Sequence, residues 1–198
     1  DTVLWAKNVP TAYSPFLLFP VQTKRQTGLL IPRVSTSDRK GFEYEQPLFI
    51  ALSRNTDATI YADYMSDRGT KIGAEFRYVL DNKTKGSMFL DSLEDDKIDD
   101  GTSKTNDYSF STTPQRTNRD RYWFRMKHSQ ELDNGITAKL DIDVVSDEDY
   151  LQEFKDGFTG YDETKEYFEK EFGRGLDEYD NSIRQNWLTI RKSWDSYS

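Results

Sequence analysis

The sequence of 198 residues contains no cysteine and only one histidine. The absence of cysteine excludes disulfides, thiolate metal sites and a cysteine nucleophile within these residues. The single histidine, His128, is followed directly by Ser129. Adjacent strand residues point to opposite faces, so these two side chains do not fit a Ser–His–carboxylate triad. Because no glycine-rich phosphate loop is present either, we expect neither an enzyme nor a bound cofactor.

Positive charge and long apolar runs are also scarce. Lys and Arg total 27 against 35 Asp and Glu, and the net charge of −8 argues against a general nucleic-acid binder. No stretch approaches roughly 18 consecutive apolar residues, which excludes a transmembrane helix but not a transmembrane β-barrel, whose strands alternate polar and apolar residues. Aromatic residues reach 14%, which argues against a disordered chain.

An alternation of polar and apolar residues runs through much of the chain. In residues 71–80, 121–128 and 137–144, apolar side chains occupy every second position and mostly charged ones lie between them. This period of two predicts β-strands with one apolar and one charged face. Each predicted strand spans about ten residues, which exceeds the usual 5–6 and matches the roughly 9–11 that cross a membrane.

Seven breaks separate the predicted strands, at residues 38–40, 53–56, 67–69, 81–85, 95–119, 133–135 and 146–181. In the second half of the chain short and long breaks alternate, as the short periplasmic turns and longer outer loops of outer-membrane barrels do. The last break is acidic and aromatic, and its residues 164–172 predict a short helix. Residues 186–194 predict a further strand, with ambiguous faces.

Two segments depart from the alternation. Residues 91–101 are acidic but lack the alternating acids and terminal Glu of a calcium loop, so we expect a solvated loop and no metal site. Residues 9–21 contain three prolines, which predicts an edge or connecting segment. We place a domain boundary near Lys24. The chain starts at Asp1 without Met or a basic-then-apolar leader, so we expect an internal piece of a longer protein.

Several short motifs follow one another in order: VPTAYSPFLLFPV at 9–21, KRQTGLLIP at 24–32, GFEYEQP at 41–47, DATI at 57–60, YMSDRG at 64–69, EFRY at 75–78 and VSD at 145–147. No single motif is specific. Their order and spacing closely resemble the LptD family, the lipopolysaccharide-assembly proteins of the Gram-negative outer membrane, also called organic solvent tolerance protein or OstA. The resemblance is nearly continuous over residues 3–154 and weak beyond them.

The resemblance implies an all-β fold. LptD proteins have a periplasmic β-jellyroll followed by a large antiparallel transmembrane β-barrel of about 26 strands. Residues 1–24 would then be the end of the jellyroll and its linker, and residues 25–198 the first strands, about eight, and loops of the barrel. The implied location is the cell outer membrane, with the N-terminal part in the periplasm.

The resemblance also implies lipopolysaccharide transport without covalent chemistry. In the family, the periplasmic bridge protein LptA delivers lipopolysaccharide to the barrel. The sugars of lipopolysaccharide then pass through the barrel lumen, which also contains the plug lipoprotein LptE. The molecule then leaves sideways between the first and last strands. Pro32 and Pro47 match the family's gate prolines, which would weaken this seam by removing ladder donors. Their residue types alone allow a simpler interpretation, a strand end at Pro32 and a bulge at Pro47.

The charged strand faces fit either a hydrated lumen or the solvent side of a soluble sheet. Because Arg or Lys on the lipid face costs about 2–4 kcal/mol at midplane, we favour the lumen. Four aromatic residues fit interfacial girdles or the lipid-facing band, with plain core packing as the alternative: Tyr64, Phe76, Tyr122 and Trp123. The lumen-facing candidates are Lys71, Glu75, Arg77, Arg121, Arg125, Lys127, Lys139, Asp141 and Asp143.

Two alternatives stay open at this point. A soluble β-rich domain that binds a ligand or a partner would predict shorter strands and one buried face. An outer-membrane barrel lipase would need a His–Ser pair across neighbouring strands, for which only His128 is available.

Overall fold

A computed structural model describes residues 2–6, 9–14, 25–98, 118–147 and 149–194. Strands β1 (Thr2–Ala6) and β2 (Val9–Ser14) form a small antiparallel sheet of their own. Pro10 pairs with Trp5, where the register shifts between Leu4 and Trp5. Proline is thus placed at an irregularity of an edge strand, where its missing N–H does least harm.

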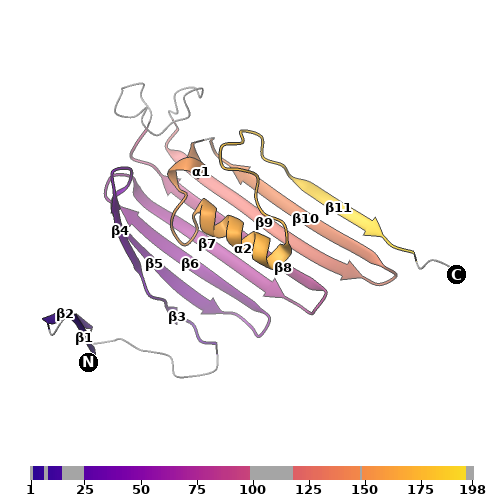
Figure 1. Ribbon diagram of the computed structural model, residues 1–198, viewed down its shortest axis with the longest axis horizontal. Helices are drawn as coiled ribbons and strands as arrows, with labels where there is room; N and C mark the ends of the chain where they lie inside the picture. Colours follow the sequence, from indigo (N-terminus) through magenta and orange to yellow (C-terminus); the bar gives the residue numbers. More distant parts are fainter. Residues whose placement is uncertain (1, 7–8, 15–24, 99–117, 148, 195–198) are drawn as a thin grey trace.

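The second sheet contains nine antiparallel strands, and neighbours in the sequence are neighbours in the sheet from β5 to β11 (Figure 1). The all-β expectation is therefore confirmed, and the six strands from β5 to β10 are 10 to 13 residues long. The strands are β3 (Gly28–Leu29), β4 (Arg33–Ser37), β5 (Gly41–Ala51), β6 (Thr56–Met65), β7 (Gly69–Val79), β8 (Thr84–Glu94), β9 (Asp120–Leu132), β10 (Ile136–Val145) and β11 (Trp187–Lys192).

The breaks predicted from the alternation lie between these strands. Since consecutive strands are antiparallel, the connections at 52–55, 80–83 and 133–135 lie at one end of the sheet, here called the turn end. The other end, the loop end, carries two short turns and both long connections, 95–119 and 146–186. The tight turn after β9 contains Asn134 and Gly135 with φ of 62° and 70°, the backbone conformation that this residue pair adopts most readily in hairpins.

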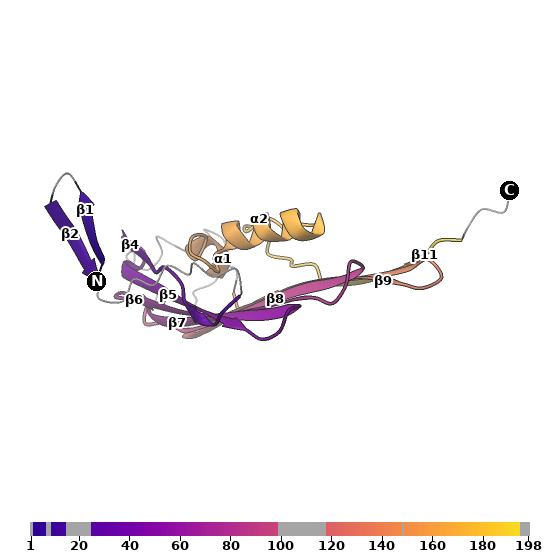
Figure 2. The same cartoon turned by 90° about the horizontal axis from the view of Figure 1, so that it is seen from below.

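The connection 146–186 folds back over one face of the sheet (Figure 2). It contains α1 (Tyr150–Glu153) and α2 (Tyr161–Phe172). Helix α2 has Asp162 and Glu163 in its first turn and ends at Gly173, whose φ of 63° suits a helix C-terminus. The predicted helix is thus present and starts three residues earlier than expected. Among the described residues, no helix is long and apolar enough to cross a membrane.

The two faces of the sheet differ in chemistry. The face under α1 and α2, here called the charged face, also carries a small apolar core at the loop end, made of Met65, Leu93, Trp123, Tyr150, Leu151, Phe154 and Tyr161. On the opposite face, here called the apolar face, large side chains are exposed, among them Phe42, Tyr44, Tyr64, Ile72, Leu90, Tyr122 and Val144.

Trp123 does not belong to an exposed aromatic band, contrary to expectation. It is 0% exposed, and its indole N–H donates to Asp143 Oδ1 at 2.8 Å. The reason is the strand period itself, because Trp123 lies two residues from both Arg121 and Arg125 and shares their face. Tyr64 and Tyr122 are exposed on the apolar face, as predicted for a girdle or lipid-facing position.

Candidate functional site

The nine lumen candidates lie at alternate positions of β7, β9 and β10 and share the charged face of the sheet. Arg77 is partly exposed, and Lys139 is exposed beyond the end of α2. The remaining candidates are buried beneath the 146–186 connection: Lys71, Glu75, Arg121, Arg125, Lys127, Asp141 and Asp143.

Two buried arginines bind the 146–186 connection to the loop end of the sheet. Arg68, from the turn between β6 and β7, donates from Nε to Asp95 Oδ1 at 2.8 Å. Arg121 of β9 lies 2.9 Å from Asp95 and 2.6 Å from Asp147. Both guanidinium groups donate to the same carboxylate oxygen of Glu153 in α1. One acidic side chain of the connection therefore joins two separate parts of the sheet.

Electrostatics favours the ionised form of this cluster. Burial raises the pKa of Asp95, but hydrogen bonds from Arg68 and its positive charge outweigh burial and hold that pKa below the ordinary value of 3.8. The ring centroid of Phe154 lies 5.0 Å from the Arg68 guanidinium. The ring centroid of Tyr150 lies 5.3 Å from the Arg121 guanidinium. These contacts fit cation–π interactions that replace part of the lost hydration.

Further along the sheet the charge pattern of the connection is complementary to that of the strands. Arg125 pairs with Asp91, donates to the Thr159 carbonyl at 2.7 Å and lies 3.8 Å from the Trp123 ring centroid. In the other direction, Arg174 and Arg184 of the connection pair with the strand carboxylates Asp141 and Asp143, respectively. The charged face is thus neutralised partly by pairs within the sheet, such as Arg125 with Asp91, and partly by side chains of the connection.

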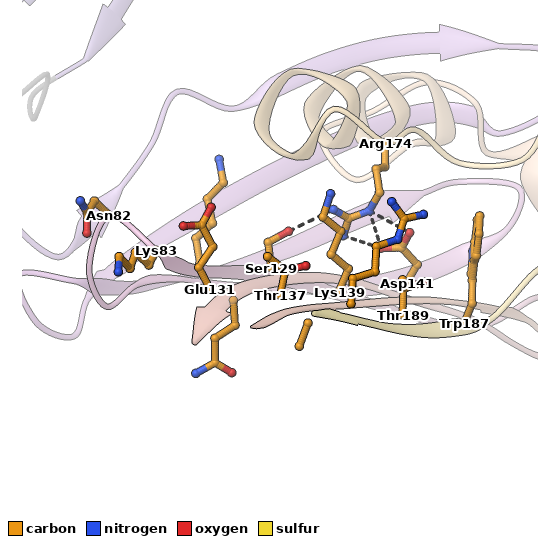
Figure 3. A pocket seen from close by; sticks show the side chains of 14 residues that line it. Asn82, Lys83, Ser129, Glu131, Thr137, Lys139, Asp141, Arg174, Trp187 and Thr189 are labelled. Carbon is orange, nitrogen blue, oxygen red and sulfur yellow. Dashed lines mark hydrogen bonds and ion pairs between the residues drawn. The ribbon is translucent and has the colours of Figure 1, made fainter. Parts of the chain in front are cut away.

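A cleft of about 440 Å³ remains open at the turn end of the charged face (Figure 3). Strands β8 to β11 form its floor, and Arg174 lines its side next to α2. The register also settles the ambiguous faces of the last strand, because Trp187 and Thr189 pair with Asp141 and Lys139 and therefore share the charged face.

The two prolines lie beside a break in the first strand of the large sheet, Pro32 within the break and Pro47 opposite it. Pro32 occupies the gap between β3 and β4, whereas Pro47 lies inside β5 and pairs with Tyr61. Leu29 pairs with Leu48 and Arg33 with Glu45, so the first strand has one residue more than β5 across this gap. This geometry is a β-bulge opposite Pro47, so the bulge lies in the partner strand and not at Pro47 itself.

Comparison with known protein families decides the affiliation. A family model described as LptD protein matches residues 2–172, which include both helices. The chain belongs to the LptD family. The LPS-assembly protein LptD of Idiomarina loihiensis is 32% identical over 188 residues, which cover 95% of this chain and 22% of that protein. Those of Pseudoalteromonas atlantica and Bordetella pertussis are each 34% identical over 76% and 78% of the chain. The chain spans about a fifth of the length of these LptD relatives.

In this LptD chain, the side chain of Gln46 supplies the donor that Pro47 lacks. The Leu30 N–H donates to the Pro47 carbonyl at 3.0 Å, but Pro47 has no N–H to return to the Leu30 carbonyl. Gln46 Nε2 donates to that carbonyl at 2.9 Å and to the Pro47 carbonyl at 3.0 Å. The Tyr44 hydroxyl donates to Gln46 Oε1 at 2.9 Å and orients the amide.

Sequence reasoning did not single out Gln46, Glu153, Arg174 or Arg184. Their roles depend on contacts between distant segments, such as the contact of Arg68 with Glu153, which are 85 positions apart in the sequence. The acidic residues 91–98 are not a solvated loop, contrary to the expectation for residues 91–101, because Asp91 and Asp95 pair with buried arginines. Residues 99–101 of that run lie outside the described residues. His128 bonds the Tyr78 hydroxyl on the apolar face, opposite Ser129.

We predict that Glu153→Gln in the full-length protein loosens the 146–186 connection. Removing one partner of a buried ion cluster costs about 3–5 kcal/mol, because charge is left uncompensated. Hydrogen exchange in α1 and α2 should therefore become faster, while the exposed control Glu166→Gln should leave it unchanged. Acid should also loosen the connection, because the pKa of Asp95 is lower in the folded chain than in the unfolded chain. The stabilisation from Asp95 is therefore complete above the unfolded pKa and is lost as the pH falls through the folded pKa. Equal exchange in both variants would contradict this role of Glu153.

We also predict that Gln46→Leu weakens the attachment of the first strand. The substitution leaves the Leu30 carbonyl without its donor, a loss of about 0.5–1.5 kcal/mol, so exchange in residues 25–37 should rise up to about tenfold. Gln130→Leu on β9 removes the same side chain from a position without a proline and serves as the matched control. If exchange rises equally in both variants, or in neither, Gln46 has no special part in holding the strand.

Proposed function

We propose that the chain forms the start of the barrel in an outer-membrane lipopolysaccharide-assembly protein and performs no covalent chemistry. Residues 1–24 would be the end of a periplasmic β-jellyroll and its linker, and residues 25–198 the first strands and loops of the barrel. Membership of the LptD family and the names of its relatives support this role. The observation that carries it is the two-faced sheet, with buried charge on one face and exposed apolar side chains on the other.

In the proposed orientation the turn end faces the periplasm and the loop end faces outward. Both long connections leave the loop end, as in outer-membrane barrels, where the outer loops are the longer ones. The apolar face would contact lipid, and the charged face would line the lumen through which the sugars of lipopolysaccharide pass. LptA would deliver this cargo on the periplasmic side, and LptE would be the partner in the lumen.

The proposed exit for the cargo lies beside the first strand. Three features make that strand easy to displace: β3 has only two residues, Pro32 interrupts the strand, and Pro47 removes a donor from β5. By contrast β5 to β10 pair over nine or more consecutive positions. A seam next to the weakest strand opens at the lowest cost in hydrogen bonds.

The two alternatives are less well supported. A soluble domain rarely exposes a large contiguous apolar patch, whereas Ile72, Leu90 and Tyr122 are all exposed on one face of this sheet. A barrel lipase would need His128 beside a serine, but His128 bonds Tyr78 and lies on the face opposite Ser129.

The gate is tested in the full-length protein by replacing both Pro32 and Pro47 with Ala. The alanine N–H groups should hold the first strand more firmly on β5 and make it harder to displace, so disulfide crosslinking between cysteines placed on the first and last barrel strands should increase and lipopolysaccharide at the cell surface should decrease. Pro10→Ala, in the separate small sheet, is the matched control. Unchanged crosslinking and export in the double variant would mean that the prolines only shape the strand, and the gate proposal would be wrong.

A further inference from the structure

The open cleft at the turn end of the charged face has an excess of positive charge. Five basic side chains line it, against the two acidic ones Glu131 and Asp141. Asp141 is already neutralised, because Arg174 donates to both of its oxygens at 2.7–3.0 Å. The basic residues are Lys83, Lys85, Lys139, Arg174 and Arg191.

Two of these cations lie on neighbouring strands and are both available to a ligand. Lys139 and Arg191 are exposed, and neither forms an ion pair or a hydrogen bond with any described residue of the chain through its side chain. Their strand positions are fixed by neighbours, since Lys139 pairs with Thr189 and Arg191 with Thr137. Lys139 and Arg191 are therefore diagonal neighbours on one face, a spacing of about 7–8 Å, so both cations border the same cleft.

Neutral donors and an aromatic ring complete the cleft. Lys139 is flanked in the sheet by Ser129 and Thr189. The Ser129 Oγ accepts a hydrogen bond from Arg174 at 3.0 Å, which leaves its own proton for a ligand oxygen. Trp187, 57% exposed, presents its ring to the same cleft (Figure 3).

We propose that this cleft binds a phosphate-bearing sugar, with Lys139 and Arg191 on the phosphate and Trp187 against the sugar ring. Charge-assisted hydrogen bonds from Lys and Arg are the strongest that a phosphate receives from side chains, and Ser129 and Thr189 add neutral donors. This inference rests on the proposed function, because the sugar would belong to the lipopolysaccharide that enters at the turn end. The cleft would then be the first site on the charged face to hold the cargo.

The test uses the full-length protein with a photo-crosslinking amino acid at Thr137, which lines the cleft but is not one of the proposed ligand groups, and purified lipopolysaccharide as the probe. Intact lipopolysaccharide should crosslink, and phosphatase-treated lipopolysaccharide should crosslink about tenfold less, as expected for the loss of one charge-assisted contact. Lys139→Gln and Arg191→Gln should each produce a similar loss, and Lys139→Arg should restore crosslinking. Lys192→Gln is the matched control, because Lys192 adjoins Arg191 on β11 but points to the apolar face.

The possible outcomes distinguish a failure of the proposed phosphate site from a failure of the proposed transport function. Equal crosslinking of treated and intact lipopolysaccharide, or an equal loss in Lys192→Gln, would overturn the phosphate site. Competition by millimolar inorganic phosphate at the same strength as by lipopolysaccharide would reduce it to a general anion site and would overturn the sugar assignment. A second crosslinker at Glu166, on the exposed surface of α2, tests the function itself. Crosslinks at neither position would contradict the proposed transport role, whereas crosslinks at Glu166 alone would overturn only the cleft.

Discussion

The neutralisation of one charged sheet face is the constraint on which the rest of this structure depends. A buried arginine or carboxylate without a partner costs several kcal/mol, and the face of β5 to β10 under the helices carries many of both. The strands alone do not satisfy these groups. Glu153, Arg174 and Arg184 arrive from the 146–186 connection and complete the ion pairs. The helices are therefore held on the sheet largely through charge complementarity, and their aromatic side chains fill the space between the pairs.

This arrangement divides the sheet into a fixed part and a loosely attached edge. Strands β8 to β10 are bound both to one another and to the connection, and the ion pairs restrict their movement. The first strand has less of that support. Its Arg25 and Arg33 pair with Asp57 and Glu45, but it is broken between β3 and β4 and lies opposite a proline. There the side chain of Gln46 takes the place of a backbone donor. Such an edge would separate while the charged face keeps its shape, as the proposed sideways release requires.

The alternation in the sequence predicted the strands and breaks well because it is a local property. It placed the turn at 133–135 correctly, and it put Lys71, Arg121 and Asp143 on one face. It did not reveal what covers that face, because the period of two shows to which face a side chain points but not which segment packs against that face. Trp123 was assigned by residue type to an exposed band, although its position between Arg121 and Arg125 already fixed its face. Gln46 has no local signal except that it precedes a proline within a strand.

The central claim is that the two faces meet different solvents, and paramagnetic labelling tests it most directly. Nitroxide side chains would be placed at Ile72, exposed on the apolar face, and at Lys139, exposed on the charged face, of the full-length protein in a lipid bilayer. Collision with oxygen should dominate at Ile72, and collision with a water-soluble nickel complex should dominate at Lys139. Dominant collision with the nickel complex at both positions would place the sheet in water and contradict the assignment of its apolar face to lipid.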